Sequence, residues 1–145
     1  MSFAQITQSD AVAQVELLLV DDENAFRLKL QQRLQAMGLE LRAVSCCAEA
    51  LHLMARRNVD VIIMDMQMPV VDGIECLRQV KQSWPKVEVI LLTAHASVQS
   101  GIEGMESGAF DYCLKPIDVP DLLDKLELAA QKALINKEKS EISNN

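Results

Sequence analysis

The sequence predicts an α/β fold in which a doubly wound, five-stranded parallel sheet is covered by five helices. Five short apolar runs recur from residue 15 onward, and segments with the spacing of amphipathic helices lie between them. Runs such as Val61-Ile62-Ile63-Met64 are apolar throughout rather than alternating. Strands that alternate with helices predict a parallel sheet, and continuously apolar strands fit a sheet buried on both faces.

The five apolar runs are the expected strands. Their lengths fall within the usual range for strands of globular proteins. In chain order they are Val15–Val20, Leu39–Val44, Val59–Met64, Val87–Leu92 and Phe110–Leu114, of which the second and the fifth are the weaker.

The first three helices each have a recognisable boundary. In the first, apolar residues share one face from Phe26 to Met37, and Gly38 lies where a helix stop is expected. The second is marked by apolar residues from Ala50 onward and ends near residue 58. The third opens with Asp72-Gly73 and ends before Pro85.

The last two helices are less regular. The segment Ser97–Ser107 has one apolar face, but Gly101 and Gly104 each weaken it by about 1 kcal/mol relative to Ala. The final helix begins at Asp118 and keeps an apolar stripe as far as Ala133. We therefore expect one domain over residues 15–135, an N-terminal tail over 1–14, and a C-terminal tail or the start of a linker over 136–145.

The composition bounds the class of protein. The chain has 145 residues, 50% of them hydrophobic and 24% charged, which excludes a wholly disordered chain. A net charge of −7 argues against nucleic acid or an anionic membrane as a partner. No apolar run approaches the ~20 residues of a membrane span, and the first residues lack the features of a secretory signal. We expect a cytoplasmic protein whose four cysteines, Cys46, Cys47, Cys76 and Cys113, are reduced thiols.

Polar side chains follow four of the expected strands. Asp21 and Asp22 come after the first strand, Asp65 after the third, Thr93 after the fourth and Lys115 after the fifth. Each alone is typical of a turn or a helix cap. Because the carboxyl ends of parallel strands meet at one edge of the sheet, all five are expected to converge there.

The chemistry of this set is coherent. Three carboxylates held close together repel one another and favour a divalent cation with oxygen ligands. Mg²⁺ fits best, because the sequence has no cluster of His and Cys for a softer metal. One carboxylate can then act as a nucleophile toward phosphorus, while a hydroxyl and an ammonium hold the phosphoryl oxygens.

These residues resemble the receiver domain of bacterial two-component response regulators, which has a flavodoxin-like, CheY-like (βα)5 fold. The likeness rests on Asp21-Asp22, Asp65 in Asp-Met-Gln-Met-Pro, Thr93-Ala94 and Lys115-Pro116, and on the spacings between them. It covers the chain from about Val15 to Ala133 and includes the Asp72-Gly73 turn. These motifs together, at these spacings, are highly specific for receiver domains.

The resemblance implies a role for each residue of the set. Asp65 would accept a phosphoryl group, and Thr93 and Lys115 would bind it. Asp22, Asp65 and the backbone carbonyl of Gln67 would ligate Mg²⁺, with Asp21 helping through water. The Lys115–Pro116 bond would be cis. The donor would be a sensor histidine kinase or a phosphotransfer protein.

The resemblance also implies a switch. Thr93 would move toward the phosphoryl group while the ring of Tyr112 swings inward. The alternative is that Tyr112 is simply a half-buried strand residue. We expect Gly101 and Gly104 to keep their helix marginally stable. Gln67 and His95 would flank the path of the attacking water and tune the lifetime of the phosphorylated state, or would be exposed residues without kinetic effect.

We therefore expect a receiver that signals by protein contact and is not an enzyme beyond assisting its own phosphorylation and dephosphorylation. Its output would be a downstream protein or a C-terminal output domain, with a phosphorylation-dependent homodimer as a further expectation. The alternatives are a receiver module cut from a longer transcriptional regulator and an unphosphorylated pseudo-receiver scaffold. An aspartyl phosphatase would want a second carboxylate two residues after Asp65, where Gln67 stands.

Overall fold

The core of the molecule is one parallel sheet of five strands. The computed structural model describes residues 6–7, 9–94 and 98–143. The strands follow the order β2-β1-β3-β4-β5, and all four neighbouring pairs are parallel. They are β1 (Leu17–Val20), β2 (Leu41–Val44), β3 (Val61–Asp65), β4 (Glu88–Thr93) and β5 (Asp111–Leu114). The expected doubly wound α/β fold is confirmed.

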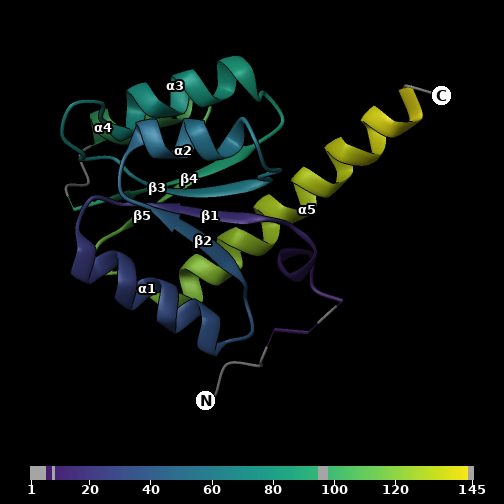
Figure 1. The fold of residues 1–145 in the computed structure, drawn as a ribbon, viewed down its shortest axis with the longest axis horizontal. Helices are drawn as coiled ribbons and strands as arrows, with labels where there is room; N and C mark the ends of the chain where they lie inside the picture. The colour runs from purple at the N-terminus through teal and green to yellow at the C-terminus, as the bar shows by residue number, and fades with distance from the viewer. Residues whose placement is uncertain (1–5, 8, 95–97, 144–145) are drawn as a thin grey trace.

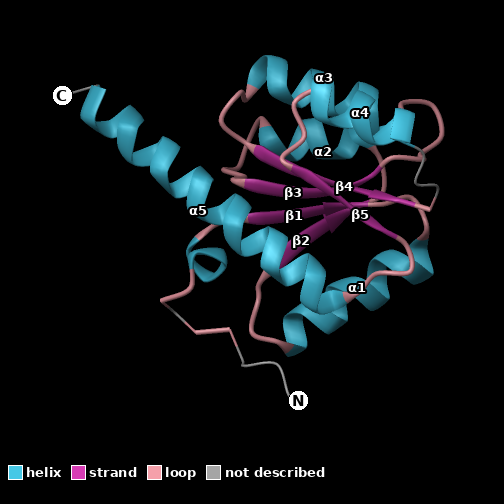
Figure 2. Ribbon diagram, turned by 180° about the vertical axis from the view of Figure 1, so that it is seen from behind, coloured by secondary structure: helices cyan, strands magenta, loops and turns pink. Residues whose placement is uncertain are grey.

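Helices cover both faces of the sheet (Figure 1). One face carries α1 (Asn24–Ala36) and α5 (Val119–Ser143), as the view from behind also shows (Figure 2). The other carries α2 (Cys47–Met54), α3 (Gly73–Ser83) and α4 (Val98–Glu106). The chain order reverses between β1 and β3, and a doubly wound sheet forms its ligand crevice at the carboxyl side of such a point.

The strands divide their side chains between two hydrophobic cores. In β1, Leu17 and Leu19 pack in the core beneath α1 and α5, whereas Leu18 and Val20 pack in the core beneath α2 and α3. All four are buried, which explains why the run is apolar throughout. Burying one such side chain stabilises the fold by about 1.5–3 kcal/mol, so this alternation fixes the strand's register.

The helix boundaries follow the expected signals, with one difference. Asp72 caps α3, because its Oδ1 accepts a hydrogen bond from the N–H of Glu75 at 2.9 Å. Gly38 follows α1 with a φ of +97°, a conformation that glycine adopts without strain. The second helix, α2, ends at Met54 rather than near residue 58.

Both ends of the described chain are more ordered than expected. Ala11–Gln14 forms a 3-10 helix, η1, whose first two N–H groups donate to the carboxylate of Glu127 in α5 at 3.2 and 3.0 Å. The N–H of Ile6 donates to the carbonyl of Met37 at 3.2 Å. At the other end, α5 continues to Ser143 and projects beyond the sheet (Figure 1). In the described residues, no helix is long and apolar enough to cross a membrane.

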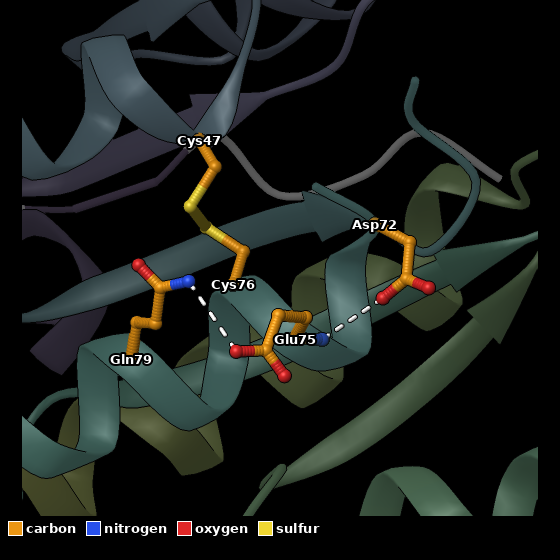
Figure 3. Close-up of a disulfide and its surroundings, with 5 residues drawn as sticks. All are labelled: Cys47, Asp72, Glu75, Cys76 and Gln79. Carbon is orange, nitrogen blue, oxygen red and sulfur yellow. Dashed lines mark hydrogen bonds between the residues drawn. A yellow bond between two sulfur atoms is a disulfide. The ribbon is translucent and has the colours of Figure 1, made fainter. Parts of the chain in front are cut away.

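The expectation of four reduced cysteines is wrong. A disulfide joins Cys47, at the start of α2, to Cys76 in α3 (Figure 3). Cys46 and Cys113 are free thiols. The two linked residues are 29 positions apart in the sequence. Their pairing depends on how α2 packs against α3, and sequence spacing does not show this.

Candidate functional site

The predicted site residues meet at the carboxyl edge of the sheet. Asp21 and Asp22 directly follow β1, and Asp65 is the last residue of β3. Thr93 ends β4, and Lys115 directly follows β5. The N–H of Lys115 donates to the carbonyl of Thr93 at 2.8 Å, which continues the pairing of the two strands past their ends.

Three carboxylates form the centre of the site. One oxygen each from Asp21, Asp22 and Asp65 lies within 4.8 Å of the other two. Asp21 is fully buried and Asp65 is 4% exposed, whereas Asp22 is open to solvent. Clustered hard oxygen donors with one solvent-exposed member suit a cation such as Mg²⁺, which binds through a few carboxylates and keeps several waters.

Lys115 supplies a positive charge that contacts two of these carboxylates. Its Nζ lies 3.0 Å from Asp21 Oδ2 and 3.5 Å from Asp65 Oδ1. The same ammonium sits 4.2 Å from the centre of the Phe26 ring, which packs one side of it. The Lys115–Pro116 peptide bond is cis, the conformation that the resemblance implied.

Backbone groups hold the two buried carboxylates in place. The N–H of Glu23 donates to Asp21 Oδ1 at 2.9 Å, and the N–H of Gln67 donates to Asp65 Oδ1 at 3.1 Å. The first residue of α3, Gly73, lies directly against this backbone. A Cβ at Gly73 would stand 2.3 Å from the carbonyl oxygen of Asp65, so only glycine fits there.

The electrostatics of the cluster favour a neutralising ligand. The pKa of Asp65 is raised to about 6, mainly by burial and also by the negative charge of Asp21, while the Gln67 N–H and Lys115 lower it. The Lys115 ammonium and the Arg27 guanidinium, which donates to the Asp21 carbonyl at 2.8 Å, stand against three carboxylates, so the site keeps an excess of negative charge. The donor set therefore fits a hard divalent cation.

The expected switch residues lie at the β4–β5 edge. Thr93 is buried, and Tyr112 is 38% exposed on β5. The Tyr112 ring stands beside Gly101 of α4, with Cε1 at 3.5 Å from where a Cβ on that glycine would be. Lys125 of α5 donates to the Tyr112 carbonyl at 2.8 Å. In this structure, the ring lies outside the core.

Gly104 has a packing role that the sequence did not suggest. A Cβ on Gly104 would lie 2.8 Å from Leu91 Cδ1 in the core. The glycine therefore lets α4 approach β4, in addition to lowering helix propensity. A Cβ on Gly101 would make only ordinary van der Waals contacts with the Tyr112 ring. Of the two glycines in α4, Gly101 can therefore be replaced without repacking the core.

Other residues at the rim were missed or stay untested. Phe26 was interpreted only as a helix-face residue, yet it contacts the site lysine. Val70, in the loop after Asp65, is fully exposed and has a φ of +70°, which is strained for a branched side chain. Gln67 is exposed, and only its backbone N–H is seen to bind Asp65. His95 lies outside the described residues.

The strand order β2-β1-β3-β4-β5 defines a flavodoxin-like α/β domain, and the acidic cluster and Lys115 lie at the carboxyl edge of its sheet. The family model of the response regulator receiver domain matches residues 17–127. Regulatory protein AtoC of Escherichia coli strain K12 is 40% identical over 118 residues, which cover 81% of this chain and 25% of AtoC. The chain therefore belongs to the response regulator receiver domain family.

Two further relatives agree. The DNA-binding transcriptional regulator NtrC of Escherichia coli strain K12 is 35% identical over 111 residues, which cover 77% of this chain and 24% of NtrC. The solved structure of Vibrio cholerae chemotaxis protein CheY4 matches with a TM-score of 0.75 and 30% identity, covering 79% of this chain and 98% of CheY4. The chain thus spans about a quarter of the length of the curated relatives it matches, whereas the match covers nearly all of the CheY4 structure.

Proposed function

We propose that this receiver domain accepts a phosphoryl group on Asp65 from a phosphohistidine of a sensor kinase or phosphotransfer protein. The observation that carries the proposal is the convergence of three carboxylates, with one oxygen of each within 4.8 Å of the others, on an ammonium that lies 3.0 Å from Asp21 and 3.5 Å from Asp65. An Asp65 oxygen forms a bond to phosphorus as the phosphorus–nitrogen bond of the donor breaks. The imidazole leaves with the electron pair and takes up a proton.

The surrounding residues prepare Asp65 for this step. The Gln67 N–H holds one Asp65 oxygen at 3.1 Å, which fixes the orientation of the carboxylate. Lys115 stands 3.5 Å from the same oxygen, where its ammonium can stabilise the negative charge of the incoming phosphoryl group. The hydroxyl of Thr93, at the adjacent strand end, would bind a second phosphoryl oxygen.

The acidic cluster is the proposed Mg²⁺ site. Asp22, Asp65 and the carbonyl of Gln67 would be ligands, and Asp21 would act through water. A bound Mg²⁺ supplies positive charge toward the phosphoryl oxygens during transfer. Apart from catalysing its own phosphorylation and dephosphorylation, the domain would have no enzymatic activity.

Phosphorylation of Asp65 can be tested directly. The chain is incubated with Mg²⁺ and acetyl phosphate, and the gain of one phosphoryl group is measured by mass and located by peptide mapping. The Asp65→Asn variant should show no gain. The Asp124→Asn variant, which changes an exposed residue of α5, should react like the wild type. Labelling that survives in Asp65→Asn, or that does not require Mg²⁺, contradicts the proposal.

The proposed output surface is the edge formed by α4, β5 and α5. Each of these elements carries exposed large hydrophobic side chains: Ile102 and Met105 on α4, Tyr112 and Leu114 on β5, and Leu128 and Ile135 on α5. Exposed apolar side chains that form a contiguous patch mark surfaces that bind other proteins. The outward ring of Tyr112 would turn inward when Thr93 binds the phosphoryl group, and this would reshape the surface for a downstream protein or a second copy of the chain.

We also infer that the domain works in the cytoplasm as a module of a longer regulator. Relatives such as AtoC and NtrC extend well beyond the matched region. The last helix, α5, continues past the sheet and would suit the start of a linker (Figure 2). The domain itself, with its net charge of −7, would not bind nucleic acid or membranes. The sequence of the gene beyond codon 145 tests this inference.

A further inference from the structure

Two buried cysteines connect neighbouring helices on one side of the sheet. Cys47 is the first residue of α2, Cys76 lies one turn into α3, and their Cα atoms are 5.8 Å apart (Figure 3). Both belong to the core beneath α2 and α3. This Cα separation is typical of a disulfide that forms without backbone movement.

Each end of this disulfide lies three residues from a backbone contact with the acidic cluster. On the α2 side, the carbonyl of Val44 accepts the N–H of Asp21 at 3.2 Å. On the α3 side, the N–H of Gly73 donates to the carbonyl of Met66 at 2.9 Å, and Gly73 packs against the backbone of Asp65. The disulfide therefore joins the backbone supports of the two buried carboxylates.

We propose that Cys47 and Cys76 are a reversible redox pair, oxidised by low-molecular-weight disulfides such as oxidised glutathione, whose disulfide stiffens the backbone around the acidic cluster. Disulfides inside cells are commonly transient and redox-sensing rather than permanent. The proposal rests on the positions of the two cysteines and on the cytoplasmic location proposed above, and it does not depend on phosphorylation at Asp65.

The disulfide forms by thiol–disulfide exchange in two steps. Cys47 and Cys76 are 3% and 0% exposed, so one of them must first reach solvent through local opening of its helix. Its thiolate then attacks the sulfur–sulfur bond of oxidised glutathione, and a mixed disulfide forms as one glutathione thiolate leaves. The second cysteine then attacks the protein sulfur of that mixed disulfide, the Cys47–Cys76 bond forms, and a second glutathione leaves. Two electrons pass from the cysteine pair to glutathione disulfide, and the two cysteine protons end on the released thiols.

The other two thiols do not replace this pair. Cys113 lies in the core on the opposite face of the sheet, and burial raises the pKa of its thiol to about 11. The sheet separates Cys113 from Cys47 and Cys76, so it cannot form a disulfide with either. Cys46 is half-buried next to Cys47 and could be capped by glutathione, so a Cys46→Ser variant removes that side reaction.

The test follows disulfide formation and local amide exchange together. The full chain, as wild type and as Cys46→Ser, is equilibrated at graded ratios of reduced to oxidised glutathione, alkylated, and mapped by mass spectrometry. We expect one reversible transition that links Cys47 to Cys76. In the oxidised form, the amides of Asp21 and Gly73 should exchange several-fold more slowly. The amide of Lys115, beyond β5, should be slowed less. The midpoint of thermal unfolding should rise by roughly 10 °C.

Three results would overturn the proposal. The first is that oxidised glutathione forms no Cys47–Cys76 bond in the folded chain. The second is that the bond forms but reduced glutathione does not break it, which makes it a permanent crosslink. The third is that exchange slows equally at Asp21, Gly73 and Lys115, because the crosslink then acts only on global stability.

Variants separate the pair from the other cysteines. Cys113→Ala should keep the redox transition, and Cys76→Ala should lose it together with the change in amide exchange. Because Cys76 is fully buried, its replacement can itself weaken the fold. Cys47→Ala, at the first position of α2, is therefore measured in parallel and should give the same loss.

Discussion

Replacing Asp65 by Asn should stabilise the cation-free protein at neutral pH but not in acid. The carboxylate of Asp65 is buried beside Asp21, and its pKa is raised from 3.8 to about 6. Because this folded-state pKa lies above the unfolded one, ionisation of Asp65 costs folding free energy. The cost is absent below about pH 4, grows as pH rises, and is complete above about pH 7. A pKa change of this size corresponds to about 3 kcal/mol, which is the largest gain that Asn can give.

The gain is measured by urea unfolding in EDTA at a series of pH values, followed by the fluorescence of Trp84, the single tryptophan. The free energy of unfolding of Asp65→Asn should exceed that of the wild type by up to about 3 kcal/mol at pH 7.5. The two should converge near pH 4. Asp124→Asn serves as the matched control and should follow the wild type throughout. Mg²⁺ at neutral pH should stabilise the wild type more than the Asn variant.

Two results would refute this reasoning. If Asp65→Asn is less stable than the wild type at pH 7.5, burial of the charge is not the dominant effect. If the difference between the two proteins does not change with pH, the Asp65 carboxylate does not titrate between pH 4 and 7 in the folded state.

Three further substitutions test the backbone around the site, each by urea unfolding. Gly73→Ala places a Cβ 2.3 Å from the carbonyl of Asp65 and should destabilise the fold by about 3 kcal/mol, whereas a loss below about 0.5 kcal/mol would contradict this packing. Val70→Gly relieves a positive φ at an exposed position and should stabilise by about 1 kcal/mol; a loss of stability would show that the loop is not strained. Glu127→Ala removes the acceptor of two η1 N–H groups and should cost about 1–3 kcal/mol with faster exchange of those amides, and unchanged exchange would count against the contact.

The site can be predicted because, in a parallel sheet, residues that follow different strands in the sequence lie at the same edge of the sheet. Asp21, Asp65 and Lys115 are far apart in the sequence, but each directly follows a buried strand. Once those strands are recognised, their carboxyl ends must lie along one edge of the sheet. The sequence therefore predicts both the fold class and the residues that meet at this edge.

The features that the sequence did not reveal depend on how helices and ends pack. The Cys47–Cys76 disulfide requires α2 and α3 to lie side by side, and no local pattern encodes that distance. The contact of Phe26 with Lys115 depends on how α1 packs beside the acidic cluster. Residues 11–14 were expected to be tail because they have no period. They are ordered instead by Glu127, which lies more than a hundred residues away.

The charges of the acidic cluster also affect the stability of the loops that surround it. At neutral pH, the buried Asp65 carboxylate costs the fold about 3 kcal/mol, which is a factor of more than 100 in an equilibrium constant. That cost is what remains after the Gln67 N–H and Lys115 have lowered the pKa of Asp65, and Lys115 is shared between Asp65 and Asp21. Any species that neutralises Asp65 in the folded state, whether a proton or a cation, removes this cost and so raises the free energy of unfolding. Ligands at the acidic cluster should therefore act on the stability of the surrounding loops as well as on the chemistry of Asp65. The backbone at Gly73, which touches Asp65, would transmit this effect to α3.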